Sequence, residues 1–134
     1  MSTMLVYRVE TSNGKGPYNG FNAWDLTIAQ MARHGEMSSS HANPKTHPTP
    51  QADRSWRLNP KSQDFGDRHL FAFASRADLV AWFGGWGVHL QDCGYRVGVY
   101  RAPVAEVIAG RNQVAVNRDY MEPVRQYPAG KLIP

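Results

Sequence analysis

An arginine precedes a glycine-rich turn near the start of the chain, in the stretch VYRVETSNGKGPYNGF, residues 6–21. The guanidinium of Arg8 is a permanent cation that can hold phosphate or carboxylate through two parallel hydrogen bonds. Gly14 and Gly16 allow backbone conformations closed to other residues, and successive amides in such a turn can cradle an anion. The pattern therefore suggests a binding site for an anion, such as the phosphates of a nucleotide.

Two interpretations of this stretch stay open. Its glycine spacing matches neither a P-loop nor a dinucleotide fingerprint, so an ordinary tight turn is the alternative to an anion cradle. Strand alternation places Val6, Arg8 and Glu10 on one face, away from the more apolar side. Arg8 is therefore expected either to pair with Glu10 on a solvated face or to lie in a cleft under the glycine turn.

The histidines and the single cysteine show no spacing typical of a metal site. His41 and His47 fall in a long polar segment, whereas His69 begins a strand and His89 lies on a helix. No metal is therefore expected. Cys93 has no cysteine partner, which excludes an internal disulfide, and we expect it to be a buried, unreactive thiol.

Aromatic residues beside basic ones are a second feature that could bind a nucleotide. Trp56 lies between Arg54 and Arg57, and Tyr18 belongs to the glycine turn. Aromatic rings stack on bases, and a neighbouring guanidinium adds cation–π attraction. Tyr18 and Trp56 are therefore candidate contacts to a ring of the ligand.

Hydrophobic periodicity predicts the elements that position these residues. Residues 5–10 alternate as a strand, and residues 22–34 show helical spacing, with Asn22 as the N-cap and Gly35 as the stop. Residues 35–64 contain four prolines and few apolar side chains, which is typical of a mobile loop or an ordered lid.

A strand followed by a capped helix is the clearest pattern in the second half. Residues 69–75 are apolar on both faces, and Ser75 with Asp78 resembles a capping box. Apolar residues then recur at helical spacing, which predicts one helix with these residues facing the core: Leu79, Trp82, Phe83 and Trp86.

Three further strands are expected. Residues 94–103 should be central, because Gly98 lets a neighbour approach the backbone closely. Another strand follows the turn at Gly110, and residues 119–128 form an edge strand containing Pro123. The prediction is an α+β fold: a single compact domain, residues 1–134, with a central mixed or antiparallel sheet, two or three short helices and a long polar loop.

Composition and charge narrow the classes of partner. The chain is 42% hydrophobic, and it has neither an apolar run long enough to cross a membrane nor an N-terminal secretory signal, so a cytoplasmic protein without a membrane partner is expected. The formal charge is +4, from eleven arginines and four lysines against eleven acidic residues. The expected partner is an anionic small molecule such as a nucleotide, or an acidic macromolecule.

The order of these motifs resembles an ADP-ribosyltransferase-like domain of the arginine-serine-glutamate type. The resemblance implies that Arg8 and the turn hold the diphosphate of NAD, that Ser75 positions the ribose, and that Tyr18 or Trp56 stacks on a ring. Gln113 stands where that family has its catalytic glutamate. Because an amide supplies no charge to the cationic centre, catalysis would need Glu106 or Glu122 as a substitute.

In size and aromatic content the chain also resembles small bacteriophage proteins of unknown function. That resemblance implies the alternative to an NAD-dependent transferase: a non-enzymatic anti-defence protein that sequesters a nucleotide signal or blocks a nucleic-acid-handling complex of the host. A third hypothesis treats the arginines as an interface for a protein or a nucleic acid.

Overall fold

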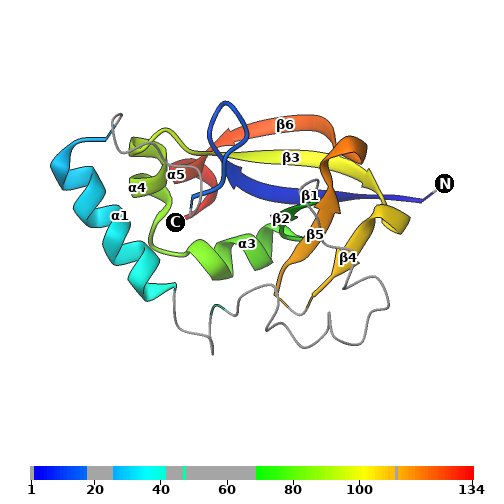
Figure 1. Ribbon diagram of the computed structural model, residues 1–134, viewed down its shortest axis with the longest axis horizontal. Coiled ribbons are helices and arrows are strands. Elements are labelled where there is room, and N and C mark those ends of the chain that lie inside the picture. The colour runs from blue at the N-terminus through cyan, green and yellow to red at the C-terminus, as the bar shows by residue number, and fades with distance from the viewer. Residues whose placement is uncertain (1, 18–25, 42–46, 48–68, 111) are drawn as a thin grey trace.

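The computed structural model describes residues 2–17, 26–41, 47, 69–110 and 112–134. Tyr18, Asn22, Trp56 and most of the 35–64 segment lie outside this part of the chain. The regular elements, shown in Figure 1, are in chain order β1 (Thr3–Glu10), α1 (Ile28–Ser40), β2 (His69–Ala72), α3 (Arg76–Phe83), α4 (Gly87–Asp92), β3 (Arg96–Pro103), β4 (Val107–Ala109), β5 (Val114–Asn117), β6 (Glu122–Pro128) and α5 (Ala129–Leu132). None of the described helices is long and apolar enough to cross a membrane.

The strands form two antiparallel sheets. The first sheet has the order β1-β3-β6, and the second has the order β2-β5-β4. A single bridge joins them, in which the backbones of Tyr7 and Phe73 exchange two hydrogen bonds of 2.8 Å. The α+β prediction is confirmed, with two small sheets and four short α-helices in place of one central sheet and two or three helices.

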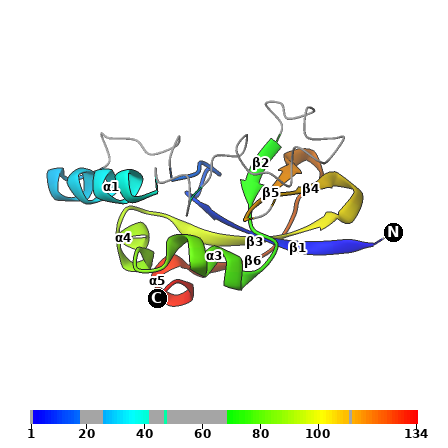
Figure 2. The same cartoon turned by 90° about the horizontal axis from the view of Figure 1, so that it is seen from below.

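The two faces of the first sheet have different neighbours. Figure 2 shows the second sheet on one side and α3, α4 and α5 on the other. Val6, on the side of the second sheet, packs with Ala102, Val114 and Val116 in an apolar cluster between the sheets. The helices cover the part of the opposite face that carries Val9 and Val97, and Tyr7 packs at the edge of the same core.

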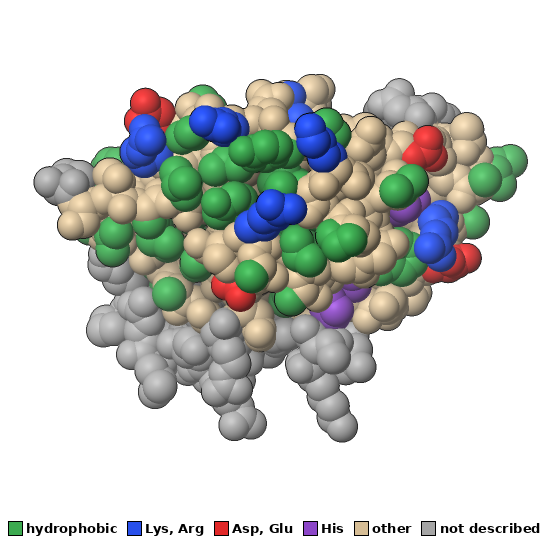
Figure 3. Space-filling view, turned by 180° about the vertical axis from the view of Figure 1, so that it is seen from behind, with side chains coloured by type: hydrophobic (Ala, Val, Ile, Leu, Met, Phe, Trp, Pro, Cys, Tyr) green, Lys and Arg blue, Asp and Glu red, His purple; other side chains and the backbone are tan. Residues whose placement is uncertain are grey.

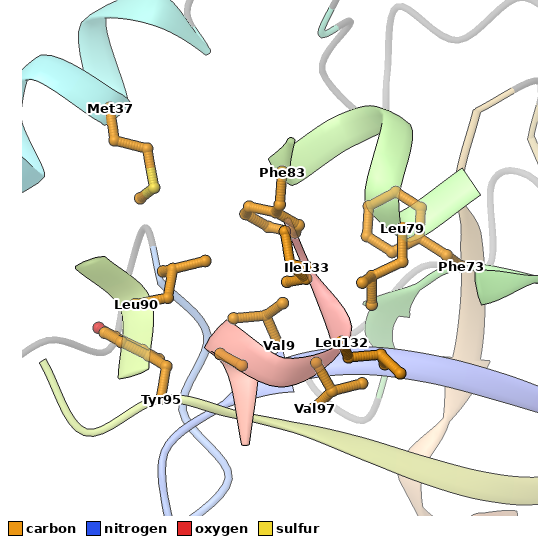
Figure 4. Close-up of a cluster of buried hydrophobic side chains, with 11 residues drawn as sticks. Val9, Met37, Phe73, Leu79, Phe83, Leu90, Tyr95, Val97, Leu132 and Ile133 are labelled. Carbon is orange, nitrogen blue, oxygen red and sulfur yellow. The ribbon is translucent and has the colours of Figure 1, made fainter. Parts of the chain in front are cut away.

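The larger core lies between the first sheet and the helices. Its buried side chains, drawn in Figure 4, are Val9, Met37, Phe73, Leu79, Phe83, Leu90, Tyr95, Val97, Ala129, Leu132 and Ile133. The C-terminal segment packs closely on α4 because Gly87 has no side chain: a Cβ there would lie 1.9 Å from the carbonyl oxygen of Ile133. Contact this close between backbones requires glycine.

Helix α1 begins and ends later than its sequence pattern indicates. Its N-cap is Thr27, which forms a capping box with Gln30: the backbone N–H of each residue donates to the side chain of the other. The helix continues through Gly35 to Ser40, so the expected stop at Gly35 is wrong, as is the assignment of residues 36–40 to a loop. A single exposed glycine costs a helix only about 1 kcal/mol, which neighbouring turns can offset.

The strand and the cap around Ser75 are confirmed. Ser75 is the N-cap of α3, and its hydroxyl accepts a hydrogen bond of 3.1 Å from the backbone N–H of Asp78. The helix ends at Phe83, because Gly84 leaves helical geometry and Gly85 adopts φ 86°. Trp86, expected on the same helix, instead precedes α4.

The predicted positions of the later strands are also confirmed. β3 is the central strand of the first sheet, and β6, with Pro123, is an edge strand. Gln113 precedes β5 in the turn from β4, and both strands belong to the second sheet.

His41 makes the stability of this fold depend on pH. It is the C-cap of α1, is 8% exposed, and its ring contacts His47 and Phe83. Burial, followed by the charge of His47, lowers its pKa from 6.5 to about 4. Since the unfolded chain binds the proton at a higher pH than the folded protein, the stability contributed by neutral His41 is present above pH 6.5 and is lost as pH falls toward 4.

We expect His41→Gln to reduce the loss of stability between pH 7.5 and pH 5 by about 2 kcal/mol. Urea unfolding of both proteins at the two pH values measures this difference, and His69→Gln, at the start of β2, is the control. An equal loss in wild type and His41→Gln would contradict the prediction.

Candidate functional site

Arg8 lies between the two sheets and beneath the glycine turn. It is 9% exposed, and its Nη1 and Nη2 donate hydrogen bonds of 2.7 Å and 3.2 Å to the carbonyl oxygens of Phe71 and Gly14. Its Nε is 3.8 Å from Glu10 Oε2. The expected pairing with Glu10 is present, but the solvated face is wrong, because β2 and the turn cover this side of β1.

Glu10 is the buried carboxylate of this cluster. It is 2% exposed, and it accepts a hydrogen bond from the hydroxyl of Tyr100 on β3. Burial, followed by this hydrogen bond, raises the pKa of Tyr100 to about 12, so the tyrosine keeps its proton and remains a donor at neutral pH. Burial lowers the pKa of Arg8, and the charge of Glu10 opposes that effect. The cluster is therefore a cation and an anion that stabilise each other out of water.

Gly98 provides the space that this cluster occupies. It lies opposite Arg8 in the pairing of β1 with β3. A Cβ at this position would lie 2.3 Å from Glu10 Oε1 and 2.8 Å from Tyr100 Cε2. The expectation that a neighbour approaches the backbone at Gly98 is confirmed, and that neighbour is the protein's own carboxylate.

The glycine turn presents an acceptor to Arg8. Gly14 has φ 84°, its carbonyl accepts from Arg8, and its N–H donates to the carbonyl of Thr11. The N–H of Lys15 donates to the hydroxyl of Thr11. Gly16 packs on the guanidinium, since a Cβ there would lie 3.3 Å from Nη2. Two backbone N–H groups of the turn therefore donate hydrogen bonds to Thr11 within the same turn. The turn binds the guanidinium of Arg8 through the carbonyl of Gly14.

The remaining predicted site residues lie on other elements. Ser75 caps α3, the backbone carbonyl of buried Gln113 accepts a hydrogen bond from the N–H of Gly110, and Glu122 begins the exposed edge strand β6. The hydrogen bonds and the ion pair described above for Arg8 go to Phe71, Gly14 and Glu10 and not to these three residues. Tyr18 and Trp56 lie outside the described residues.

A small depression lies beside the start of α3. Its lining residues are Asp78, Ala81, Trp82 and Asn112, and its volume is about 80 Å³. Sites for small molecules and cofactors usually have about 300–1,000 Å³. This depression is therefore too small to enclose a dinucleotide.

The structure also brings together three side chains that sequence spacing did not connect. His34 on α1 lies against His89 and Cys93, and one potential ligand atom from each lies within 4.8 Å of the others. His89 and Cys93 are four residues apart around α4, a spacing that puts two side chains on one helix face. The spacing of His89 and Cys93 could have been recognised in the sequence, whereas the approach of His34 on α1 depends on the tertiary fold.

One face of the first sheet carries exposed arginines among apolar side chains. Pairing places Leu5, Arg101 and Glu122 in one row across the strands, and Tyr7, Val99 and Arg125 in the next. These rows lie on the side of α3, α4 and α5, next to the part that the helices cover: Tyr7 packs at the edge of the helix core, and Val99 is buried beneath its neighbours. Figure 3 shows hydrophobic side chains and several Lys and Arg gathered on this side of the molecule. We call these six residues the outer patch.

Removing Arg8 should destabilise the fold far more than removing an exposed partner. Arg8→Ala leaves Glu10 charged and buried and two carbonyls without their donor, so we expect a loss of about 3 kcal/mol. Arg33→Ala, which breaks the exposed pair with Glu36 and the cation–π contact with Trp86, should cost about 1.5 kcal/mol or less. Denaturant unfolding compares the two, and equal losses would show that the burial of Arg8 adds nothing.

Replacing Gly98 by alanine should lower the stability of the protein, whereas the same replacement at Gly35 should raise it. Gly98→Ala forces Glu10 or Tyr100 to move and should cost about 1–3 kcal/mol. Gly35→Ala meets no atom within 4 Å on α1 and should stabilise the protein by about 0.5–1 kcal/mol. Thermal and urea unfolding measure both, and a neutral Gly98→Ala would refute the close packing described above.

Comparison with known proteins places the chain in a family. A family model described as "Bacteriophage T4 Y00F protein" matches residues 4–130, nearly the whole chain. Comparisons with curated proteins and with solved structures give no match. The family match confirms the resemblance to small bacteriophage proteins, and it is not a match to an ADP-ribosyltransferase. The chain therefore belongs to the Bacteriophage T4 Y00F protein family.

Proposed function

We propose that this phage-family protein is a non-enzymatic binding protein that uses its outer patch to bind an acidic surface of another protein. The observation that carries the proposal is the position of Arg101 and Arg125. Both are exposed, on the same face of the first sheet, while Arg8 is buried and occupied by the chain's own acceptors.

The surroundings of these two arginines suit a protein interface. Leu5 is 38% exposed and pairs with Arg101, and Arg125 pairs with buried Val99. Apolar neighbours exclude water when a partner covers them, which strengthens the attraction between a guanidinium and a carboxylate. Arginine and tyrosine are also enriched among the residues that dominate binding at protein interfaces.

The pattern of charge favours a protein over a nucleic acid. Glu122 lies next to Arg101 in the same row, and a carboxylate there repels phosphate. Proteins that follow a nucleic-acid backbone usually carry a continuous basic groove or stripe. Two arginines, one glutamate and apolar side chains fit a mixed surface with acidic and apolar positions.

The face of the sheet suits this role better than its edge. β6 is the edge strand, but Pro123 and Pro128 lack the N–H needed to pair with an added strand. Prolines on an edge strand limit pairing with other chains. We therefore place the partner over the side chains of the outer patch. Blocking a nucleic-acid-handling complex of the host in this way is one of the anti-defence roles that the resemblance to bacteriophage proteins implies.

NAD binding, or sequestration of another nucleotide, stays a prediction that depends on the order of the motifs. It requires the guanidinium of Arg8 to exchange the carbonyl oxygens of Phe71 and Gly14 for a diphosphate. Incubation with labelled NAD and a bacterial lysate tests the chemistry, through transfer of label or release of nicotinamide. Thermal unfolding with and without nucleotides tests binding without turnover.

The outer patch can be tested by charge reversal. Arg101→Glu/Arg125→Glu should weaken binding to an acidic protein partner at least tenfold, because two attractions become repulsions. The control is Lys15→Glu/Arg33→Glu, which makes the same change in net charge at exposed positions of the glycine turn and α1. A partner captured from nuclease-treated bacterial lysate would be purified and its affinity measured for all three proteins at low and high salt.

Three results would overturn the proposal: loss of the partner after nuclease treatment, equal affinity of wild type and Arg101→Glu/Arg125→Glu, or equal weakening by the control. The first would instead indicate a nucleic-acid partner. The last would indicate attraction to net charge without a defined surface.

A further inference from the structure

The strongest unexplained feature outside the outer patch is the contact between His34, His89 and Cys93. His34 Nδ1 is 3.1 Å from His89 Nε2, and Cys93 Sγ is 3.7 Å from the same His89 atom. One potential ligand atom from each side chain lies within 4.8 Å of the others. Two imidazoles and a thiol therefore face a common point between α1 and α4.

These separations match those of ligands around one tetrahedral ion. With Zn–N near 2.0–2.1 Å and Zn–S near 2.3 Å, tetrahedral angles put two nitrogen ligands about 3.3 Å apart and a nitrogen and a sulfur about 3.6 Å apart. The observed 3.1 Å and 3.7 Å lie close to these values. Cys93 Sγ is also 3.8 Å from His89 Nδ1, and the three ligand atoms span up to 4.8 Å, so the Cys93 side chain would have to turn toward Nε2 to admit an ion.

A backbone carbonyl holds His34 in the orientation that a ligand requires. His34 is 2% exposed, and its Nε2 is 2.6 Å from the carbonyl oxygen of Pro17. A carbonyl can only accept, so Nε2 carries the proton, and Nδ1 directs its lone pair toward His89 and Cys93. Metal-binding histidines commonly donate their second N–H to such an outer partner, which fixes the tautomer.

We propose that His34 Nδ1, His89 Nε2 and Cys93 Sγ bind one Zn²⁺ ion, with water as the fourth ligand. Two imidazoles and one thiolate suit zinc, and a site with three protein ligands leaves one position open. His89 and Cys93 are only partly buried, so water can reach that position. On binding, the Cys93 thiol loses its proton to solvent, and the proton of His89 is held on Nδ1.

The ion would add to the contacts that hold α1, which include the hydrogen bonds from Gln30 Nε2 to Asp92 and the cation–π contact of Arg33 with Trp86. Of the thirteen residues of α1, only His34 and Met37 are buried. Tying His34 to two residues at the end of α4 would cross-link the helices, and it would also hold the turn at Pro17. The inferred role is therefore structural, and it is independent of the outer patch and its partner.

The test uses the full chain without a histidine tag, stripped with a chelator and kept reduced with a phosphine. Cobalt(II) should bind in a 1:1 ratio and give the visible absorption of a tetrahedral complex and the charge-transfer absorption of a cobalt–thiolate bond. Zinc should displace cobalt and raise the unfolding midpoint by about 10 °C when present at about 100 times its dissociation constant.

Three variants separate this site from adventitious binding. Cys93→Ser, almost the same size as the native residue, should abolish the charge-transfer band and weaken zinc binding at least tenfold. His89→Gln, on the partly exposed side of the cluster, should weaken zinc binding similarly. His69→Gln, which changes a histidine on β2, should leave affinity and spectrum unchanged.

Circular dichroism of the metal-free variants verifies that they are folded. Absence of the cobalt–thiolate band in wild type, or equal zinc affinity of wild type and His89→Gln, would overturn the proposal. Loss of zinc binding would leave the partner experiment on the outer patch unaffected, so the two inferences can fail separately.

Discussion

The burial of one guanidinium between two sheets is the constraint on which this structure depends. The sheets touch through the short bridge between Tyr7 and Phe73, and next to it Arg8 donates to the carbonyl of Phe71 on β2, an edge strand of the second sheet. The Arg8 side chain also donates a hydrogen bond to the carbonyl of Gly14, and the carboxylate of Glu10 balances the charge of the guanidinium. A buried cation is tolerated only when such acceptors replace water, so the positions of β1, β2 and the turn are fixed together.

This constraint also separates the parts of the molecule that stabilise it from those that can meet a partner. The side of β1 that carries Arg8 is filled by the second sheet and the turn, and the opposite side is covered by helices around Val9 and Val97. Beyond the helices, that opposite side presents Arg101 and Arg125 to solvent. Arg8 is thus structural, and the proposed interface uses the exposed Arg101 and Arg125 instead. The cluster of His34, His89 and Cys93 lies elsewhere, between α1 and the end of α4.

Features set by local chemistry could be predicted from the sequence, whereas features set by tertiary contact could not. Ser75 caps its helix through an atom three residues away, and Gly98, which lets a neighbour approach the backbone, correctly indicated that β3 is central. Alternation placed Arg8 and Glu10 on one face of β1, but it could not show that another sheet would cover that face. Gly35 was expected to end the helix because glycine is locally unfavourable in a helix. The neighbouring turns of α1 offset this cost, and their contribution does not show at Gly35 itself. His34 and His89 are 55 residues apart in the chain, so only the fold brings them together.

A double-mutant cycle on Arg8 and Glu10 tests the central claim most directly, since it isolates their coupling from the effects of each single substitution. The variants are Arg8→Met, Glu10→Gln and the pair, with Arg33→Met and Glu36→Gln as the exposed reference pair. Urea unfolding should give a coupling of at least about 1 kcal/mol for the buried pair and about 0.5 kcal/mol or less for the exposed pair. A coupling near zero for Arg8 and Glu10, with Arg8→Met as stable as wild type, would contradict the account.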